Sequence, residues 1–545
     1  MPPFAHFRLW LREGPRAERI AAIVAVLIGV ILAGLALEPV ANGSSPPQAA
    51  STLVGSDATS TGTSPQPAQP SGGADRGSTL AGTTPSRTTG RPGASVPTVA
   101  DAPILGQSAG SGLAAPSRTS IPSGAKPVSP GTTRTTASHA PLASASAACG
   151  QLIASANGIT ATTVLLDVAI VQLAGAVGDA AFDIRPDQNK IFAAVADEVN
   201  KSGGVMCGRK LVLKTYTVNP TDANDQQTKC LQMVADKPLA VINAAGYVTP
   251  ASFQCFIDAH LPVNAGVSLA RSQAEKSAPY LFGALPYSEQ QVRNAVVGFA
   301  ARGVFKGPKF SKIGLYEDNC DPAVNSEIAQ DVAASGVAAN QISTYVLDCN
   351  LVSSPVAIQQ AVIQQRGASH VFLASSILNN ENYVRLASQQ GFHPQYLTSD
   401  YGSSTSQAGS ENWDPGYAGA LGITSAHTGE FSSGIANADV TRCAKILSEH
   451  GLSPIASEQK DFTAVSDCDD VFFMVQMLDH AGANPTQLGV VQGLGTMGKQ
   501  TGGYLPDTDW NRPGRIAGGD YQREITYNGA CKCYKVVEPA FGPAY

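Results

Sequence analysis

Short apolar runs and stretches with helical spacing alternate along the chain from about residue 158. The run at 163–171 is almost entirely aliphatic and predicts a buried strand. The stretch 186–202 places Ile191, Val195 and Val199 about four residues apart and then reaches Gly203 and Gly204, which is typical of a helix and its end. The alternation continues with predicted strands at 210–217, 239–243 and 262–265 and predicted helices at 223–236 and 251–259.

The same order of elements then begins again. Strands alternating with helices pair in parallel and form a sheet covered on both faces, so the sequence predicts an α/β protein with two doubly wound lobes. The second run has predicted helices at 290–302, 324–335, 356–366 and 383–390 and predicted strands at 312–316, 342–347, 370–375 and 395–398. Beyond residue 420 we expect helices at 440–450 and 464–480 and a strand at 521–527.

The N-terminal part has a different pattern. Residues 20–37 contain no charged side chain, and a helix of that length spans about 27 Å, close to the thickness of a bilayer's hydrocarbon core. Four arginines lie between residues 8 and 19, and no lysine or arginine follows the apolar stretch until Arg76. We therefore expect a transmembrane helix at 20–37, a cytoplasmic segment at 1–19 and an extracytoplasmic remainder in a single-pass cell-membrane protein. A cleaved signal peptide is the alternative.

Residues 38–148 are dominated by Ser, Thr, Pro, Gly and Ala and contain no aromatic residue. Such a segment buries too little apolar surface to offset its chain entropy, so the sequence predicts a disordered stalk. A G-x-S-x-G motif at 106–110 lies in this stalk, without the strand and helix that a nucleophile elbow requires.

Charge and motif content argue against several function classes. The formal net charge is −6 and no cluster of Lys and Arg with interleaved aromatics occurs, so we expect no nucleic-acid partner. A G-x-G-x-x-G motif at 493–498 follows a predicted helical stretch, whereas the dinucleotide fingerprint follows a strand. The eight histidines are scattered, and a single C-x-C at 531–533 is too little for a metal site. We expect no catalytic residue, cofactor or metal, and hence no enzyme.

Three segments carry a resemblance to a known family. They are D-E-V-N-K-S-G-G-V-M-C-G-R-K-L-V-L at 197–213, A-P-Y-L-F-G-A-L-P-Y-S-E-Q-Q at 278–291 and S-D-C-D-D-V-F-F-M-V-Q-M-L-D-H-A-G at 466–482. In order and spacing they resemble the type I periplasmic solute-binding proteins, in particular the branched-chain amino-acid-binding branch of ABC-transporter substrate-binding proteins.

The resemblance implies two lobes joined by a three-segment hinge. Lobe I would comprise 149–287 plus 421–515, and lobe II 288–420 plus 516–545, with crossings near 285–288, 420–425 and 514–520. It implies an extracytoplasmic protein that captures a small polar, amino-acid-like ligand in an interlobe cleft for an ABC-type importer. A membrane-anchored sensor or cell-envelope interaction module on the same fold is the alternative, and an envelope enzyme is a third.

Ligands of doubly wound domains bind outside the carboxyl ends of the strands, so loops that follow strands hold the candidate residues. The family's Ser/Thr-rich head-group loop is replaced here by residues 245–250, so the ligand need not be a free amino acid. Each candidate could instead be a solvated loop residue or a helix cap. The predicted ligand-binding residues are Tyr247, Thr249, Ser268, Asn319, Ser376, Asp400 and Tyr401, with Glu317 and Asp318 beside them.

The ten cysteines suit an oxidising compartment. In the doubly wound topology the helices after the second and third strands share a sheet face, which brings Cys230 and Cys255 together. Cys149 enters near the amino ends of the strands, beside the Cys207 turn, and Cys320 and Cys349 follow neighbouring strands. We therefore expect the pairs 149–207, 230–255 and 320–349, and by elimination 443–468 and 531–533; the alternative is that some thiols are free.

Overall fold

The computed structural model describes residues 149–172, 184–350 and 352–545, all within the compact unit Lys126–Tyr545. The predicted transmembrane helix, the predicted stalk and most of the loop after the first strand lie outside these residues. Over the described part of the chain, no helix combines the length and the apolar character that a bilayer crossing requires.

The first sheet is a five-stranded parallel sheet with the order β2-β1-β3-β4-β5. Its second strand in this order, β1, is apolar on both faces except for Thr163 and Asp167, because helices cover both sides of the sheet. The strands are β1 Thr163–Val171, β2 Lys210–Val218, β3 Ala240–Ala244, β4 Val263–Asn264 and β5 Leu281–Phe282. We call this sheet and its helices lobe I.

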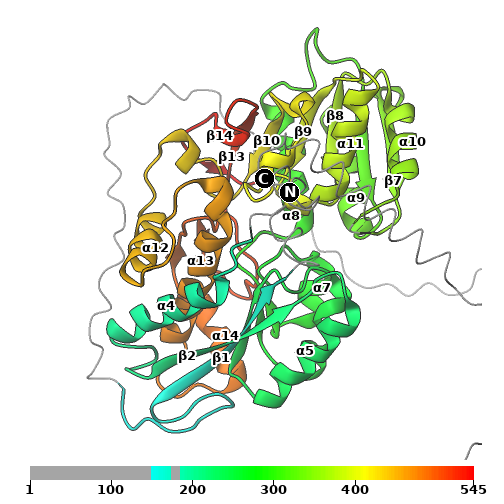
Figure 1. The fold of residues 1–545 in the computed structure, drawn as a ribbon. Helices are drawn as coiled ribbons and strands as arrows, with labels where there is room; N and C mark the ends of the chain where they lie inside the picture. The colour runs from blue at the N-terminus through cyan, green and yellow to red at the C-terminus, as the bar shows by residue number, and fades with distance from the viewer. Residues whose placement is uncertain (1–148, 173–183, 351) are drawn as a thin grey trace, which may run out of the picture. The chain divides into compact units, whose positions relative to one another are not determined.

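Helices lie on both sides of the first sheet (Figure 1). One group packs together on one side: α4 Gln188–Lys201, α12 Ala438–Glu449 and α13 Glu458–His480. On the other side lie α5 Ala223–Asp236, α6 Gln254–Asp258 and α7 Arg271–Ser277, and α14 Gln487–Gln492 follows α13. Helix α13 is buried at every position from Asp467 to Val475, because it packs against α4, α12 and β3 at once.

The second sheet has the order β14-β13-β10-β9-β8-β6-β7, parallel from β7 to β10 and antiparallel from β10 to β14. Its strands are β6 Ile313–Asp318, β7 Ile342–Leu347, β8 His370–Ala374, β9 Gln395–Ser399, β10 Leu421–Thr424, β13 Tyr521–Asn528 and β14 Cys533–Val536. Residues 421–424, assigned from the sequence to the returning segment of lobe I, thus belong to the second sheet, and the second crossing follows Thr424. We call this sheet and its helices lobe II.

Alternating side chains of the second sheet supply two separate cores. On β8, Val371 and Leu373 join a cluster rich in tyrosine, whereas Phe372 and Ala374 join the cluster beneath the other face. This follows from the pleat of a strand, which points successive side chains to opposite faces. Helices α10 Pro355–Gln365 and α11 Ile377–Gln389 contact each other, as do α8 Ser288–Ala301 and α9 Pro322–Ala334.

All ten cysteines pair as expected from the sequence, in the pairs 149–207, 230–255, 320–349, 443–468 and 531–533. Cys230–Cys255 ties α5 to α6, and Cys443–Cys468 ties α12 to α13. The bridges therefore fasten helix pairs on each side of the first sheet.

The first and third crossings between the sheets run side by side. Gly283 N donates to Ile516 O at 3.0 Å, and Gly518 N donates to Leu285 O at 3.0 Å. A Cβ atom at Gly518 would lie 1.8 Å from the carbonyl oxygen of Ala284, so only glycine fits there.

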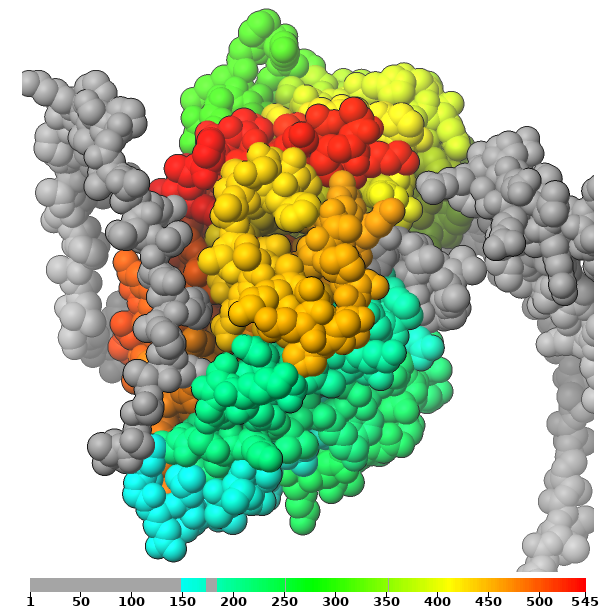
Figure 2. Space-filling view, turned by 60° about the vertical axis from the view of Figure 1, so that its left-hand side comes forward, coloured from blue at the N-terminus to red at the C-terminus, as the bar shows by residue number. Residues whose placement is uncertain are grey.

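The second crossing lies against both lobes. After β10 the chain runs past the C-terminal hairpin, where Ser433 Oγ accepts from Val536 N at 2.9 Å, and then enters α12, which packs against α4. Figure 2 shows this yellow-to-orange segment between the red C-terminal residues and the green residues of lobe I.

We predict that Gly518→Ala destabilises the protein by more than about 2 kcal/mol, because the added methyl group forces the two crossings apart. Gly495→Ala is the matched control, since a Cβ atom there meets nothing within 4 Å. Urea unfolding measures both variants. A Gly518→Ala variant within about 0.5 kcal/mol of wild type, the range of neutral surface substitutions, would contradict the tight crossing.

Candidate functional site

The carboxyl ends of β6 and β8 carry a polar network in lobe II. Ser375 Oγ donates to Asp318 Oδ2 at 2.7 Å and accepts from Asn379 Nδ2 at 3.1 Å. Asn380 Nδ2 donates to Ser404 Oγ at 2.6 Å and so reaches the loop after β9. The network fixes the loops after β6, β8 and β9 relative to one another.

Glu317 is a buried carboxyl group without an internal partner at one oxygen. Its side chain is 3% exposed, and its Oε1 has no hydrogen-bond partner among the described residues. Burial, together with the nearby Asp318, raises the pKa of Glu317 to about 8. An unsatisfied buried acceptor is costly, so this oxygen is suited to a donor that comes from outside the fold.

Tyr401 follows β9 and lies among these acidic groups. Burial raises its pKa, and the charges of Asp318, Asp321 and Glu317 raise it further. The ring is half-buried against the core that contains Ile313. The predicted residue Tyr401 is therefore placed with Glu317 and Asp318 at the carboxyl edge of the second sheet.

The other lobe II candidates have structural partners. Asp400 accepts from the hydroxyl of Thr405 and, at 2.7 Å, from Ser425 N, so it orders its own loop against the end of β10; burial raises its pKa. Ser376 accepts from Asn379 N as the N-cap of α11. Asn319 is exposed, and its N–H donates to Leu347 O.

Tyr247 is a core residue of lobe I, which corrects the ligand contact expected from the sequence. Its side chain is 0% exposed, its hydroxyl donates to Gln226 O at 2.9 Å, and its ring packs edge-on against Phe256. The cause is the turn before it, where Ala245 has a φ of 62° and redirects the chain inward.

The remaining lobe I candidates lie in the two loops that follow β3 and β4. Thr249 is exposed and precedes a 3-10 turn, where its N–H donates to Ser252 Oγ at 3.3 Å. Ser268 is half-buried in the loop after β4.

Asn243 organises both of these loops and was missed from the sequence. Its amide nitrogen donates to Tyr247 O and Ala265 O, and its amide oxygen accepts from Tyr247 N at 2.9 Å. The available signal was a polar residue in the otherwise apolar run of β3. In lobe II, Asn379 and Asn380 in the first turn of a helix were the corresponding signal.

Neither a family model nor a curated protein sequence matches the chain. Solved structures do match. A fatty acid ABC transporter substrate-binding protein from Thermomonospora curvata aligns at TM-score 0.54 and 14% identity, over 71% of this chain and 95% of that one. An ABC transporter solute-binding protein from R. palustris in complex with 4-hydroxybenzoate aligns at TM-score 0.54 and 12% identity, over 70% and 97%.

A third structure is an ABC transporter substrate-binding protein from Desulfitobacterium hafniense in complex with Leu, at TM-score 0.50 and 15% identity, over 69% of this chain and 100% of that one. The chain has the type I periplasmic-binding fold. Identities this low establish the fold alone. In open α/β sheets ligands bind outside the carboxyl ends of the strands, so the candidate ligand site lies at the loops on the carboxyl edges of both sheets.

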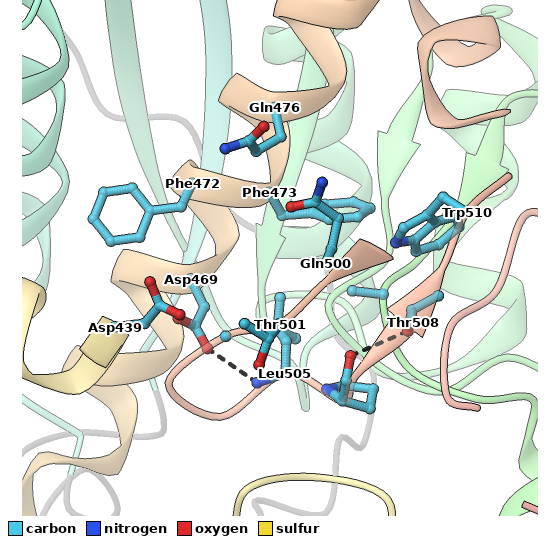
Figure 3. A pocket seen from close by; sticks show the side chains of 13 residues that line it. Asp439, Asp469, Phe472, Phe473, Gln476, Gln500, Thr501, Leu505, Thr508 and Trp510 are labelled. Atoms are coloured by element: carbon cyan, nitrogen blue, oxygen red, sulfur yellow. Dashed lines mark hydrogen bonds between the residues drawn. The ribbon is translucent and has the colours of Figure 1, made fainter. Parts of the chain in front are cut away.

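The loop that precedes the third crossing is held by a buried carboxylate of α13. Asp469 accepts from the N–H groups of Gly503, Tyr504 and Leu505 at 2.7 to 3.0 Å, and burial raises its pKa to about 6. Figure 3 shows Asp469 hydrogen-bonded to this loop, beside a small cavity lined also by Phe473 and Trp510. The cavity measures about 20 Å³, which is room for a water molecule and not for a solute.

The G-x-G-x-x-G motif lies beside the same helix. Residues Gly493–Thr496 form a 3-10 turn directly after α14, and a Cβ atom at Gly493 would lie 2.3 Å from Met477 O. The glycines thus allow close packing on α13, and no strand precedes them as a nucleotide fingerprint requires.

His427 joins the segment after the second crossing to the loop that precedes the third crossing. Its Nε2 lies 3.2 Å from Asp507 Oδ1, and its Nδ1 lies 2.9 Å from Glu430 Oε1. Burial lowers the pKa of His427, but the contacts with Asp507 and Glu430 outweigh burial and raise it from 6.5 to about 9. Arg523, on β13, pairs with the same Glu430 oxygen at 2.9 Å.

We predict that this network makes stability depend on pH. Since the folded pKa lies above the unfolded one, the contribution of His427 is fully present below about pH 6.5 and is lost as pH rises through about 9. The shift corresponds to about 3 kcal/mol. Urea unfolding at pH 6 and pH 9.5 should show wild type losing more stability than His427→Gln. Equal losses in the two proteins would exclude this role.

Proposed function

We propose that this chain is an extracytoplasmic solute-binding protein that captures a small polar ligand between its two lobes for an ABC-type importer. The proposal rests on one observation. On a type I fold, buried polar side chains hold the loops at the carboxyl edges of both sheets in fixed positions. Asn243 fixes the lobe I loops, and the Asp318–Ser375–Asn379 network fixes those of lobe II. A binding protein requires such preorganised loops.

The lobe II edge favours a ligand with a hydrogen-bond donor, such as the ammonium of an amino-acid-like solute. Glu317 Oε1 offers a free acceptor and Tyr401 a hydroxyl among acidic neighbours. The similar structures are a fatty acid substrate-binding protein and complexes with 4-hydroxybenzoate and Leu, so the fold alone does not determine the ligand class. Binding energy would then shift the population between open and closed arrangements of the lobes.

A thermal-shift screen against amino acids, amides, polyols and aromatic acids tests this proposal. A ligand at a hundred times its dissociation constant stabilises the folded state by about 2.7 kcal/mol. Tyr401→Phe should weaken the binding of the hit by about tenfold, equivalent to about 1.4 kcal/mol, as measured by calorimetry. Tyr345→Phe is the matched control, because Tyr345 lies on the edge strand β7 and its hydroxyl donates to Gln360 on α10. No hit in any class, or equal affinities of both variants, would refute the proposal.

We also propose that residues 20–37 anchor the protein in the cell membrane by a single pass, with the described residues outside. The support is the uncharged stretch and the arginines that precede it. Protease added to intact cells should then digest the folded domain, and a cytoplasmic marker protein should survive. Recovery of the full-length chain in the soluble cytoplasmic fraction would contradict this topology.

A further inference from the structure

A second pocket lies at the amino edge of the lobe I sheet, away from the loops of the candidate ligand site. It is bounded by the ends of α5 and α6, the segments that enter β3, β4 and β5, and the start of α14. Its volume is about 390 Å³, within the range of about 300 to 1,000 Å³ that small-molecule sites occupy. Its lining residues are Asn157, Val234, Lys237, Pro238, Ala259, His260, Leu261, Tyr280, Thr486, Gln487 and Leu488.

The walls of this pocket combine an aromatic pair with aliphatic side chains. The rings of His260 and Tyr280 stack with their centroids 5.0 Å apart at an interplanar angle of 26°. Val234, Leu261 and Leu488 add apolar surface, and Leu488 is 41% exposed. Such walls are suited to a planar, apolar ligand such as an aromatic ring.

The described residues that line the pocket carry a positive charge and no negative charge. Lys237 lies exposed at its rim, and none of the described residues that line it carries a carboxylate. Gln487 is held in place, since its Nε2 donates to Leu239 O at 2.7 Å and to Pro238 O at 3.2 Å. A ligand with a carboxylate would therefore meet an ammonium group and no competing anion.

The backbone at Lys237 and His260 is in the left-handed region, with φ of 54° and 53°. Both residues follow helix ends, those of α5 and α6, where glycine is the favoured residue. Helices α9, α11 and α12 follow that rule, with Gly336, Gly391 and Gly451 at the corresponding position. At the ends of α5 and α6, which border the pocket, the chain instead has a lysine and a histidine in the left-handed region, and their long or aromatic side chains lie at the rim.

We propose that this pocket is a second small-molecule site, which binds a planar aromatic carboxylate. The ring lies between the His260–Tyr280 pair and the aliphatic wall, and the carboxylate pairs with the Lys237 ammonium.

The test uses 2-naphthoate as the probe and calorimetry on the full chain. Lys237→Gly and His260→Gly should each weaken binding by about tenfold. Neither variant should lower the melting temperature, because glycine relieves the left-handed strain. The uncharged isostere 2-naphthalenemethanol should bind wild type about tenfold more weakly than 2-naphthoate, and this difference should vanish in Lys237→Gly.

Lys532→Gly is the matched control. Lys532 is a lysine with a φ of 52° beside β14 in lobe II, so its replacement relieves the same strain without touching the pocket. The proposal is overturned if 2-naphthoate fails to bind wild type at millimolar concentration, or if Lys237→Gly binds it as wild type does. A loss of affinity in Tyr401→Phe without a loss in Lys237→Gly would place the probe at the carboxyl edge and would also overturn it.

Discussion

The close approach of the first and third crossings is the constraint on which the rest of the structure depends. Gly283 and Gly518 exchange backbone hydrogen bonds with Ile516 and Leu285, and the missing Cβ of Gly518 leaves room for the carbonyl group of Ala284. Between these two crossings the chain builds most of lobe II, returns to lobe I through α12 and α13, and reaches the loop at 503–505. The three N–H groups that donate to Asp469 hold that loop in place.

Polar groups at the strand ends serve the same purpose within each lobe. Asn243, Asp318 and Asp400 are side chains whose oxygens or nitrogens replace missing backbone partners where regular pairing stops. A buried group that satisfies two loops at once positions both and leaves little freedom to either. Glu317 Oε1 and Asn380 Oδ1 are exceptions at this edge, because neither atom has a partner among the described residues.

The alternation of apolar runs and helical spacing was enough to predict most helices and strands, because tertiary packing agrees with local preference in a parallel sheet. Three of the predicted disulfides followed from the same topology, and the pairs 443–468 and 531–533 followed by elimination. The short strands β5 and β10 were not expected, since two to four residues carry no usable periodicity. At the site, Tyr401 was placed correctly at its edge, whereas Tyr247 turns into the core. Sequence spacing cannot reveal the left-handed turn at Ala245 that directs Tyr247 inward.

Left-handed conformations at residues other than glycine show where the described part of the chain tolerates strain. Met206, Cys207 and Lys532 belong to turns closed by disulfides, which hold them in place. Ala245 and Ser403 lie in loops that follow β3 and β9, at the carboxyl edges. Lys237 and His260 remain, and no disulfide or crossing requires their conformation. Helix ends explain the left-handed conformation, which glycine usually adopts there, so it is the presence of a lysine and a histidine in place of glycine that points to the pocket they border.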